Sequence, residues 1–205
     1  MISHELKFIF IHIEKTAGSS LTLKLKDYSD DNIIMGLEDE INISDINLIK
    51  QGFTTNRFQP FNNAKHLTIH EYRKYYDADM VDKYFKFAIV RDPYERFKSM
   101  FHFQVKKNFG GAYEKKDIKL IMERVFNVAL RPQTDYVDET VTIVKYENLV
   151  NDLNELSVFK EKGITFYDLP FLNKAKNKDI ILDEETKNKI RHIYYKDFLF
   201  FGYNM

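Results

Sequence analysis

A lysine, a glycine and several small hydroxyl residues directly follow an apolar run near the start of the chain. The apolar run spans residues 8–13, and the following segment reads Glu14-Lys15-Thr16-Ala17-Gly18-Ser19-Ser20. Small residues let backbone N–H groups converge on anionic oxygens, and the start of a helix adds the positive end of its dipole. Lys15 adds a full positive charge, and the hydroxyl groups add hydrogen-bond donors. This segment therefore predicts a loop that binds a phosphate-bearing ligand.

The order of these residues differs from that of a Walker A loop. A Walker A loop ends in glycine, lysine and then serine or threonine, whereas here Lys15 precedes Gly18. Ordinary NTPase chemistry is therefore not the first interpretation. The alternative without a ligand is a tight turn whose following helix is capped by Ser19 or Ser20.

A second apolar run ends directly in an arginine. Arg91 is followed by Asp92 and Pro93, which indicate a turn and the first position of a helix, where the missing N–H of proline does no harm. The planar guanidinium of Arg91 suits phosphate oxygens, and Ser99 lies about two helical turns further on. Because ligands bind at the carboxyl ends of the strands in an open α/β sheet, we expect both segments at one edge of the sheet. The alternative is that Arg91 pairs with Asp92 or Glu95.

Short apolar runs alternate with helical patterns along the chain. The runs span residues 8–13, 84–90 and 141–144, and the helical patterns span residues 71–76, 95–106, 116–128, 147–159 and 184–194. Such short runs with little alternation are typical of strands that are covered on both faces in a parallel sheet. The order of elements predicts an α/β fold, a three-layer sandwich with a central, mainly parallel sheet, in a single domain of residues 1–205.

The segment after the loop gives conflicting signals. Leu21, Leu23 and Leu25 alternate with polar residues, a period that favours a strand. A parallel sheet needs a crossover after its first strand, and a phosphate loop of this kind usually opens a helix. We therefore predict a helix here.

Composition excludes several classes of protein. The 205 residues include 31 Lys and Arg, 31 Asp and Glu, and no cysteine. The balanced charge argues against a nucleic-acid partner. A chain without cysteine forms neither disulfides nor thiolate metal sites and fits a reducing compartment. We expect a soluble, cytoplasmic protein without a transmembrane segment, because the sequence has no signal-peptide pattern and no apolar stretch of roughly 20 residues.

Together these segments resemble the sulfotransferases that use 3′-phosphoadenosine 5′-phosphosulfate (PAPS), of the carbohydrate and membrane-associated type that includes heparan sulfate 2-O- and chondroitin sulfotransferases. Residues 12–20 resemble the 5′-phosphosulfate loop of that family, and residues 90–99 resemble its 3′-phosphate motif. The other similar segments are residues 65–68, 131–136, 146–149, 172–174 and 195–203. Two departures are Glu14, where proline is common, and Asp92, where asparagine is common.

The resemblance implies a P-loop-like sulfotransferase fold. It also implies in-line transfer of the sulfuryl group from PAPS to a hydroxyl of a glycan or another small acceptor, with 3′-phosphoadenosine 5′-phosphate as the product. In this interpretation Lys15 neutralises the leaving phosphate, so that no metal is required, and residues 16–20 hold the 5′-phosphate. Arg91 and Ser99 bind the 3′-phosphate.

Four polar residues are weaker candidates. Asn173 and Lys174 belong to a loop that in relatives can reach the nucleotide, and a solvated loop explains them equally well. Gln133 and Asp135 are candidates for lining the acceptor cleft, and a turn around Pro132 explains them equally well.

The favoured base for removing the acceptor proton is a histidine, because histidine titrates near neutral pH. We favour His66, whose segment resembles one that precedes the 3′-phosphate strand in relatives and faces their acceptor site. His70 shares its face if the segment is helical. Glu14 and Glu71 are the carboxylate alternatives, and His12 is expected to be packed within the first strand.

Two other classes of function are compatible with the residues. A P-loop nucleotide kinase or other phosphotransferase shares the strand-loop-helix opening and prefers ATP with Mg²⁺. A non-catalytic nucleotide- or glycan-binding module binds its ligand and transfers nothing. The sequence indicates neither the acceptor nor the oligomeric state.

Overall fold

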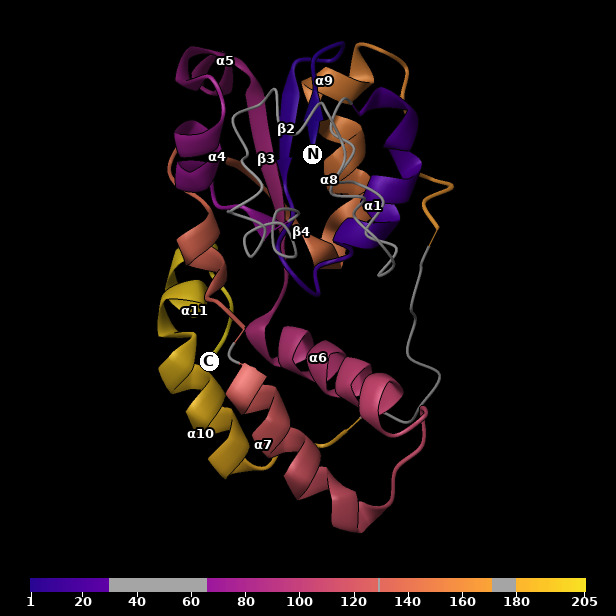
Figure 1. The fold of residues 1–205 in the computed structure, drawn as a ribbon, viewed down its shortest axis with the longest axis vertical. Helices are drawn as coiled ribbons and strands as arrows, with labels where there is room; N and C mark the ends of the chain where they lie inside the picture. Colours follow the sequence, from indigo (N-terminus) through magenta and orange to yellow (C-terminus); the bar gives the residue numbers. More distant parts are fainter. Residues whose placement is uncertain (30–65, 129, 171–179) are drawn as a thin grey trace, which may run out of the picture. The chain divides into compact units, whose positions relative to one another are not determined.

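A computed structural model describes residues 1–29, 66–128, 130–170 and 180–205 of the chain (Figure 1). The chain divides into two compact units. One comprises residues 1–90 and 135–172, and the other comprises residues 91–134 and 173–205. The single domain of residues 1–205 stays a prediction.

Among the described residues, the first unit is built on a four-stranded sheet in the order β1-β2-β3-β4. The strands are β1 (Ile2–Ser3), β2 (Phe8–Ile11), β3 (Phe85–Val90) and β4 (Thr142–Lys145). The pairs β2–β3 and β3–β4 are parallel, and the short β1 pairs antiparallel with β2. The predicted mainly parallel sheet is therefore confirmed, with strand bounds that differ by one to two residues from those of the apolar runs.

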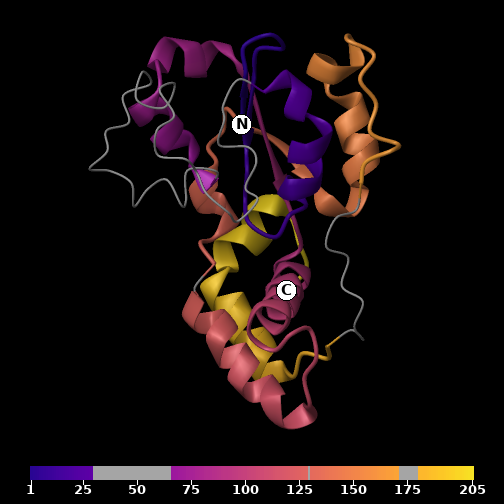
Figure 2. The same ribbon diagram turned by 45° about the vertical axis from the view of Figure 1, so that its right-hand side comes forward.

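Helices cover both sides of this sheet (Figures 1 and 2). The helices α1 (Gly18–Lys24), α8 (Leu149–Glu155) and α9 (Ser157–Lys160) lie on one side, and α4 (Ile69–Tyr75) and α5 (Ala78–Lys83) lie on the other. Side chains alternate accordingly along β3. Phe87 enters the core beneath α1, whereas the ammonium of the buried Lys86 donates to the carbonyl oxygens of Val81 and Asp82 in α5. The three predicted layers are confirmed.

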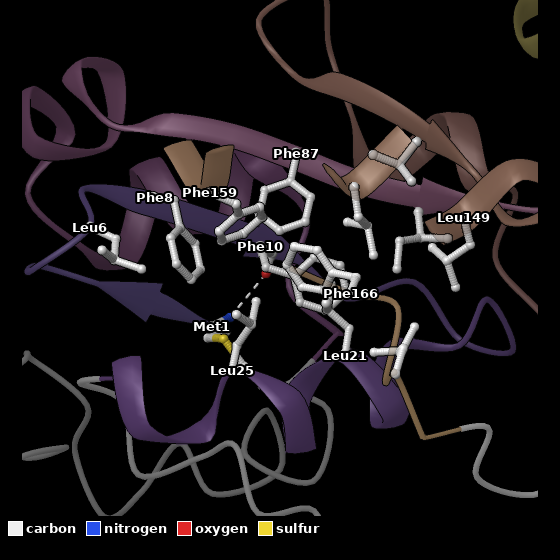
Figure 3. Close-up of a cluster of buried hydrophobic side chains, with 14 residues drawn as sticks. Met1, Leu6, Phe8, Phe10, Leu21, Leu25, Phe87, Leu149, Phe159 and Phe166 are labelled. Atoms are coloured by element: carbon white, nitrogen blue, oxygen red, sulfur yellow. Dashed lines mark hydrogen bonds between the residues drawn. The ribbon is translucent and has the colours of Figure 1, made fainter. Parts of the chain in front are cut away.

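Aromatic side chains fill the core between the sheet and α1, α8 and α9 (Figure 3). The rings of Phe10 and Phe87 stack with centroids 5.1 Å apart, and Phe159 contacts Phe8 edge-on at 5.4 Å. Burial of each such side chain contributes about 1.5–3 kcal/mol. Since both β2 and α1 are anchored in this core, the loop that joins them is fixed at both ends.

The helix predicted after the loop is confirmed. Leu21 and Leu25, four residues apart, are fully buried, whereas Leu23 is 40% exposed. The alternating leucines therefore contain a helical pair that faces the core, together with one leucine on the outer face.

The helix predicted at residues 147–159 is divided. A 3₁₀ turn (Tyr146–Asn148) leads into α8, and Leu156 then adopts an extended backbone before α9 begins. This break lets both Leu153 and Phe159 reach the core, where both are fully buried. Packing has overridden the continuous helical pattern.

The second unit is helical. Its main elements are α6 (Pro93–Asn108), α7 (Ile118–Val128), α10 (Glu184–Ile193) and α11 (Tyr195–Phe201). Short 3₁₀ turns occur at Lys115–Asp117 and, at its border with the first unit, at Gln133–Tyr136. The core of the unit is formed by apolar side chains of these helices, such as Phe101 from α6 and Phe198 from α11.

Across the described ranges, no helix is both long enough and apolar enough to cross a membrane.

Candidate active site

The loop between β2 and α1 has an unusual backbone. Lys15 and Ala17 both adopt left-handed conformations, with φ angles of 66° and 73°. This conformation costs a non-glycine residue roughly 1–2 kcal/mol, and such strain is typical of functional loops. Thr16 lies between them, fully buried, and its hydroxyl donates to the carbonyl of Ile13 at 2.9 Å. This hydrogen bond of the Thr16 hydroxyl therefore stabilises the loop itself.

The cap of α1 distinguishes between the two interpretations of the loop. The N-cap is Ala17, and no side chain in the described part of the chain caps this helix. The alternative in which Ser19 or Ser20 caps the helix is therefore wrong. The first N–H groups of a helix have no partner within the helix, so an uncapped start suits an anionic ligand. Ser19 is exposed on this first turn, and Ser20 is buried.

Gly18 is required by the ring of His12. A Cβ atom at Gly18 would lie 2.0 Å from both Cδ2 and Nε2 of His12, a distance that no real contact allows. The His12 ring stacks on Phe10 with centroids 5.7 Å apart, and it is partly buried. The prediction that His12 is packed within the strand is wrong in its placement, because β2 ends at Ile11 and the His12 ring lies over the start of α1 instead.

His66 joins the same cluster. Its ring lies edge-on to the His12 ring, with centroids 4.7 Å apart, and its Nδ1 is 2.8 Å from the carbonyl oxygen of His12. A carbonyl only accepts hydrogen bonds, so Nδ1 must carry the proton. In the neutral ring the lone pair then resides on Nε2, which is the arrangement a general base needs.

The other candidate bases differ in their surroundings. His70 is exposed on α4, and no hydrogen bond or ring contact links it to the described residues of the loop. Glu71 forms a capping box with Thr68 at the start of α4, which occupies its carboxylate. Glu14 accepts a 2.6 Å hydrogen bond from the hydroxyl of Tyr136, a buried residue. Both carboxylates therefore stabilise the fold around His66.

Arg91 directly follows β3 at the start of the second unit. Asp92 caps α6, because its Oδ1 accepts from the N–H groups of Tyr94 at 2.9 Å and Glu95 at 3.0 Å. Aspartate caps a helix as well as asparagine does, so the departure at position 92 keeps this function. The side chain of Arg91 is 17% exposed, and its guanidinium lies 3.8 Å from the Glu95 carboxylate. Ser99 is partly buried on α6, one turn after Glu95.

Gln133 was missed by sequence reasoning as a partner of Arg91. Its side chain is fully buried, and its amide makes two hydrogen bonds of 2.9 Å with the backbone of Arg91, accepting from N–H and donating to the carbonyl. The expectation that Gln133 lines the acceptor cleft is therefore wrong, because its polar end turns inward. Asp135, by contrast, is exposed. The one available signal was the polar pair Gln133-Thr134 directly after Pro132.

Asn173 and Lys174 lie outside the described residues, so their contacts with a nucleotide stay a prediction. Within the described part of the chain, no cluster of three or more histidine, aspartate or glutamate side chains could hold a metal ion.

A strand, loop and helix of this form within a three-layer α/β unit is typical of proteins that bind anionic groups at the carboxyl edge of a parallel sheet. A model of the sulfotransferase family matches residues 1–161. That match covers most of the chain and includes both candidate motifs, so the chain belongs to the sulfotransferase family. Sulfuryl transfer is the activity of this family, which makes the protein a transferase. No curated protein and no solved structure matches the chain significantly.

Proposed function

We propose that the protein transfers the sulfuryl group of PAPS to a hydroxyl of a glycan or another small acceptor, in the cytoplasm. The observation that carries the proposal is the backbone of the 14–18 loop, with left-handed Lys15 and Ala17 and a glycine that has no room for a side chain. Such a backbone brings N–H groups toward a ligand with several anionic oxygens. The family indicates sulfuryl transfer as the class of reaction, and this loop supports PAPS as the donor.

Lys15 supplies positive charge to the leaving group. As the bond between sulfur and the bridging oxygen breaks, negative charge develops on the phosphate of the departing nucleotide, and an ammonium group beside that oxygen stabilises it. The N–H groups at the start of α1 hold the remaining oxygens of the 5′-phosphate. Lysine and loop together fill the role that Mg²⁺ has in an NTPase, so the proposal requires no metal.

Arg91 and Ser99 bind the 3′-phosphate. Glu95 is 3.8 Å from the Arg91 guanidinium, and its other carboxylate oxygen lies 2.9 Å from the ammonium of Lys98. The contact between Arg91 and Glu95 is therefore long and shared. A bidentate contact with a phosphate group is shorter and stronger, so the nucleotide competes well for Arg91.

His66 removes the proton of the acceptor hydroxyl. The bond from Nδ1 to the carbonyl of His12 keeps the proton on that nitrogen, so Nε2 accepts the acceptor proton as the acceptor oxygen attacks sulfur. The resulting imidazolium holds the proton while the sulfuryl group moves in line from the phosphate oxygen to the acceptor oxygen. His70 is the second candidate for this step, but His66 precedes α4 and the N-cap residue Thr68 is extended, so the two histidines do not share a helical face.

The test measures transfer from labelled PAPS to a panel of hydroxyl-bearing acceptors. Lys15→Met is expected to lower kcat by about 10²–10³, the usual effect of removing one electrostatic contact in a transition state. Lys26→Met is the matched control, because Lys26 is exposed on the 3₁₀ helix Lys26–Tyr28 that follows α1. Equal activity of the two variants would show that Lys15 does not serve the leaving group.

Nucleotide binding and transfer measurements on the wild-type protein also distinguish the proposal from the two other classes of function. A nucleotide kinase would bind ATP with Mg²⁺ more tightly than 3′-phosphoadenosine 5′-phosphate. A non-catalytic module would bind the nucleotide but transfer nothing, and His66→Ala would then have no effect on any measured rate. The proposal predicts neither pattern.

A further inference from the structure

A buried carboxylate in the second unit is held entirely by one short segment. Asp197, on α11, is fully buried. Its Oδ1 accepts from the N–H and the hydroxyl of Thr134, at 2.9 Å and 3.0 Å. Its Oδ2 accepts from the N–H of Gln133 at 2.8 Å and from the Gln133 amide at 3.4 Å. Burying a carboxylate is costly unless such donors satisfy it, so Asp197 fixes this segment firmly.

The same segment is held at two further points within the unit. The hydroxyl of Tyr194 donates to the carbonyl of Leu130 at 3.1 Å. The buried Arg96 donates from a guanidinium nitrogen to the carbonyl of Arg131 at 3.0 Å. Residues 130–134, called the bracket below, are therefore held by α6, by α11 and by Tyr194, the residue between α10 and α11.

The Gln133 side chain connects the bracket to the backbone of Arg91. The Gln133 amide bonds both the N–H and the carbonyl of Arg91, each at 2.9 Å, in the manner of a neighbouring strand. Asp92, the next residue, is fixed by the α6 cap. The backbone of Arg91 is thus clamped on both sides, which limits the directions in which its guanidinium can point.

We propose that Gln133 and Asp197 are positioning residues for Arg91, and that they determine how strongly the protein prefers a nucleotide with a 3′-phosphate. This inference rests on the proposed function, in which Arg91 binds that phosphate. A guanidinium contacts phosphate bidentately only in a narrow range of orientations. Releasing the backbone of Arg91 therefore weakens the contact without removing the charge.

The experiment compares two variants of the full chain that each remove one side-chain donor to Asp197. Gln133→Met also releases Arg91, whereas Thr134→Val does not. Calorimetry gives the Kd of each protein for 3′-phosphoadenosine 5′-phosphate and for adenosine 5′-phosphate, which lacks the 3′-phosphate. We expect Gln133→Met to lower the ratio of the two affinities by about tenfold or more, the value of one hydrogen bond to a charged group. Thr134→Val is expected to keep the wild-type ratio.

Asp197→Asn provides an independent variant. Its amide NH₂ group would face N–H donors that the carboxylate now accepts from, so it should shift the bracket and lower the same ratio. Should Gln133→Met fail to fold by circular dichroism, Gln133→Asn asks the same question, since it keeps a polar amide but is one methylene too short to reach Arg91. In each variant, binding of adenosine 5′-phosphate should stay close to wild type.

The outcomes separate the two levels of the proposal. If the wild-type protein shows no preference for the 3′-phosphate, the proposed function fails and the inference fails with it. If the wild type shows the preference and Arg91→Met abolishes it, but the Gln133 and Asp197 variants keep it, only the positioning role is overturned. An equal loss of preference in Thr134→Val would also overturn it, because the effect would then follow general destabilisation.

Discussion

Gly18 and the ring of His12 allow a direct test of the loop. A Cβ atom on Gly18 would lie 2.0 Å from two atoms of that ring, about 1.4 Å short of the 3.4 Å at which ordinary contact begins. The ring cannot easily retreat, because His66 and Phe10 lie against it, with centroids 4.7 Å and 5.7 Å away. We therefore expect Gly18→Ala to lower the free energy of unfolding by about 1–3 kcal/mol, the range for overpacked sites.

The same substitution should be harmless once the ring is removed. In a His12→Ala background, the added methyl group enters the space that the ring has left. Alanine is also favoured over glycine in a helix by about 1 kcal/mol. Gly18→Ala is then expected to be neutral or stabilising, so the coupling free energy between positions 12 and 18 should reach about 1–3 kcal/mol.

Urea denaturation of the wild type, the two single variants and the double variant measures this coupling. We also expect Gly18→Ala alone to weaken binding of 3′-phosphoadenosine 5′-phosphate, because a displaced loop no longer directs its N–H groups at one point. A penalty of the same size in both backgrounds would refute the packing of His12 against Gly18.

Two further predictions concern stability. Leu21 is buried and Leu23 is 40% exposed. Leu21→Ala should therefore lower the free energy of unfolding by about 2–5 kcal/mol, and Leu23→Ala by less than about 0.5 kcal/mol. Equal effects of the two substitutions in urea denaturation would contradict the helical assignment of α1. At Asp138, burial opposes ionisation, but hydrogen bonds from Thr140 and Arg73 outweigh it and hold the pKa below its usual value. The ionised Asp138 carboxylate therefore stabilises the fold fully above the unfolded pKa of about 3.9, and this contribution is lost as the pH falls through the lower folded pKa. The free energies of unfolding of the wild type and Asp138→Asn, measured by urea denaturation, should converge in acid. A constant difference between them at every pH would contradict this.

Much of the fold follows from local patterns. The apolar runs that became β2 and β3 are buried on both faces, which is why little alternation was visible in them. The expectation of burial on both faces is wrong for β4, where Val144 is buried but Thr142 is exposed. The start of α6 was also predictable, because Asp92 and Pro93 are a capping residue and a first-turn residue whose preferences are set by the helix end itself. The helix α1 was predicted from topology, because its alternating leucines by themselves favour a strand.

Other features depend on contacts between distant parts of the sequence. The strand β1 has only two residues, too few to carry a pattern. The break at Leu156 is set by the core that Leu153 and Phe159 enter, not by the helix propensity of the segment. Gln133 reaches Arg91 across 42 positions, and Asp197 reaches Gln133 across 64. No local preference of glutamine or aspartate signals such partners, so the clamp on Arg91 emerged only from the structure.

The central claim is that this sulfotransferase-family chain recognises a 3′-phosphorylated nucleotide without a metal. Calorimetric titration of the wild-type protein with 3′-phosphoadenosine 5′-phosphate, with adenosine 5′-phosphate and with ATP, each with and without Mg²⁺, tests it most directly. We predict that the 3′-phosphorylated nucleotide binds about tenfold or more tightly than adenosine 5′-phosphate and that Mg²⁺ does not change its affinity. Tighter binding of ATP that requires Mg²⁺, or equal binding of the two adenosine phosphates, would contradict the claim.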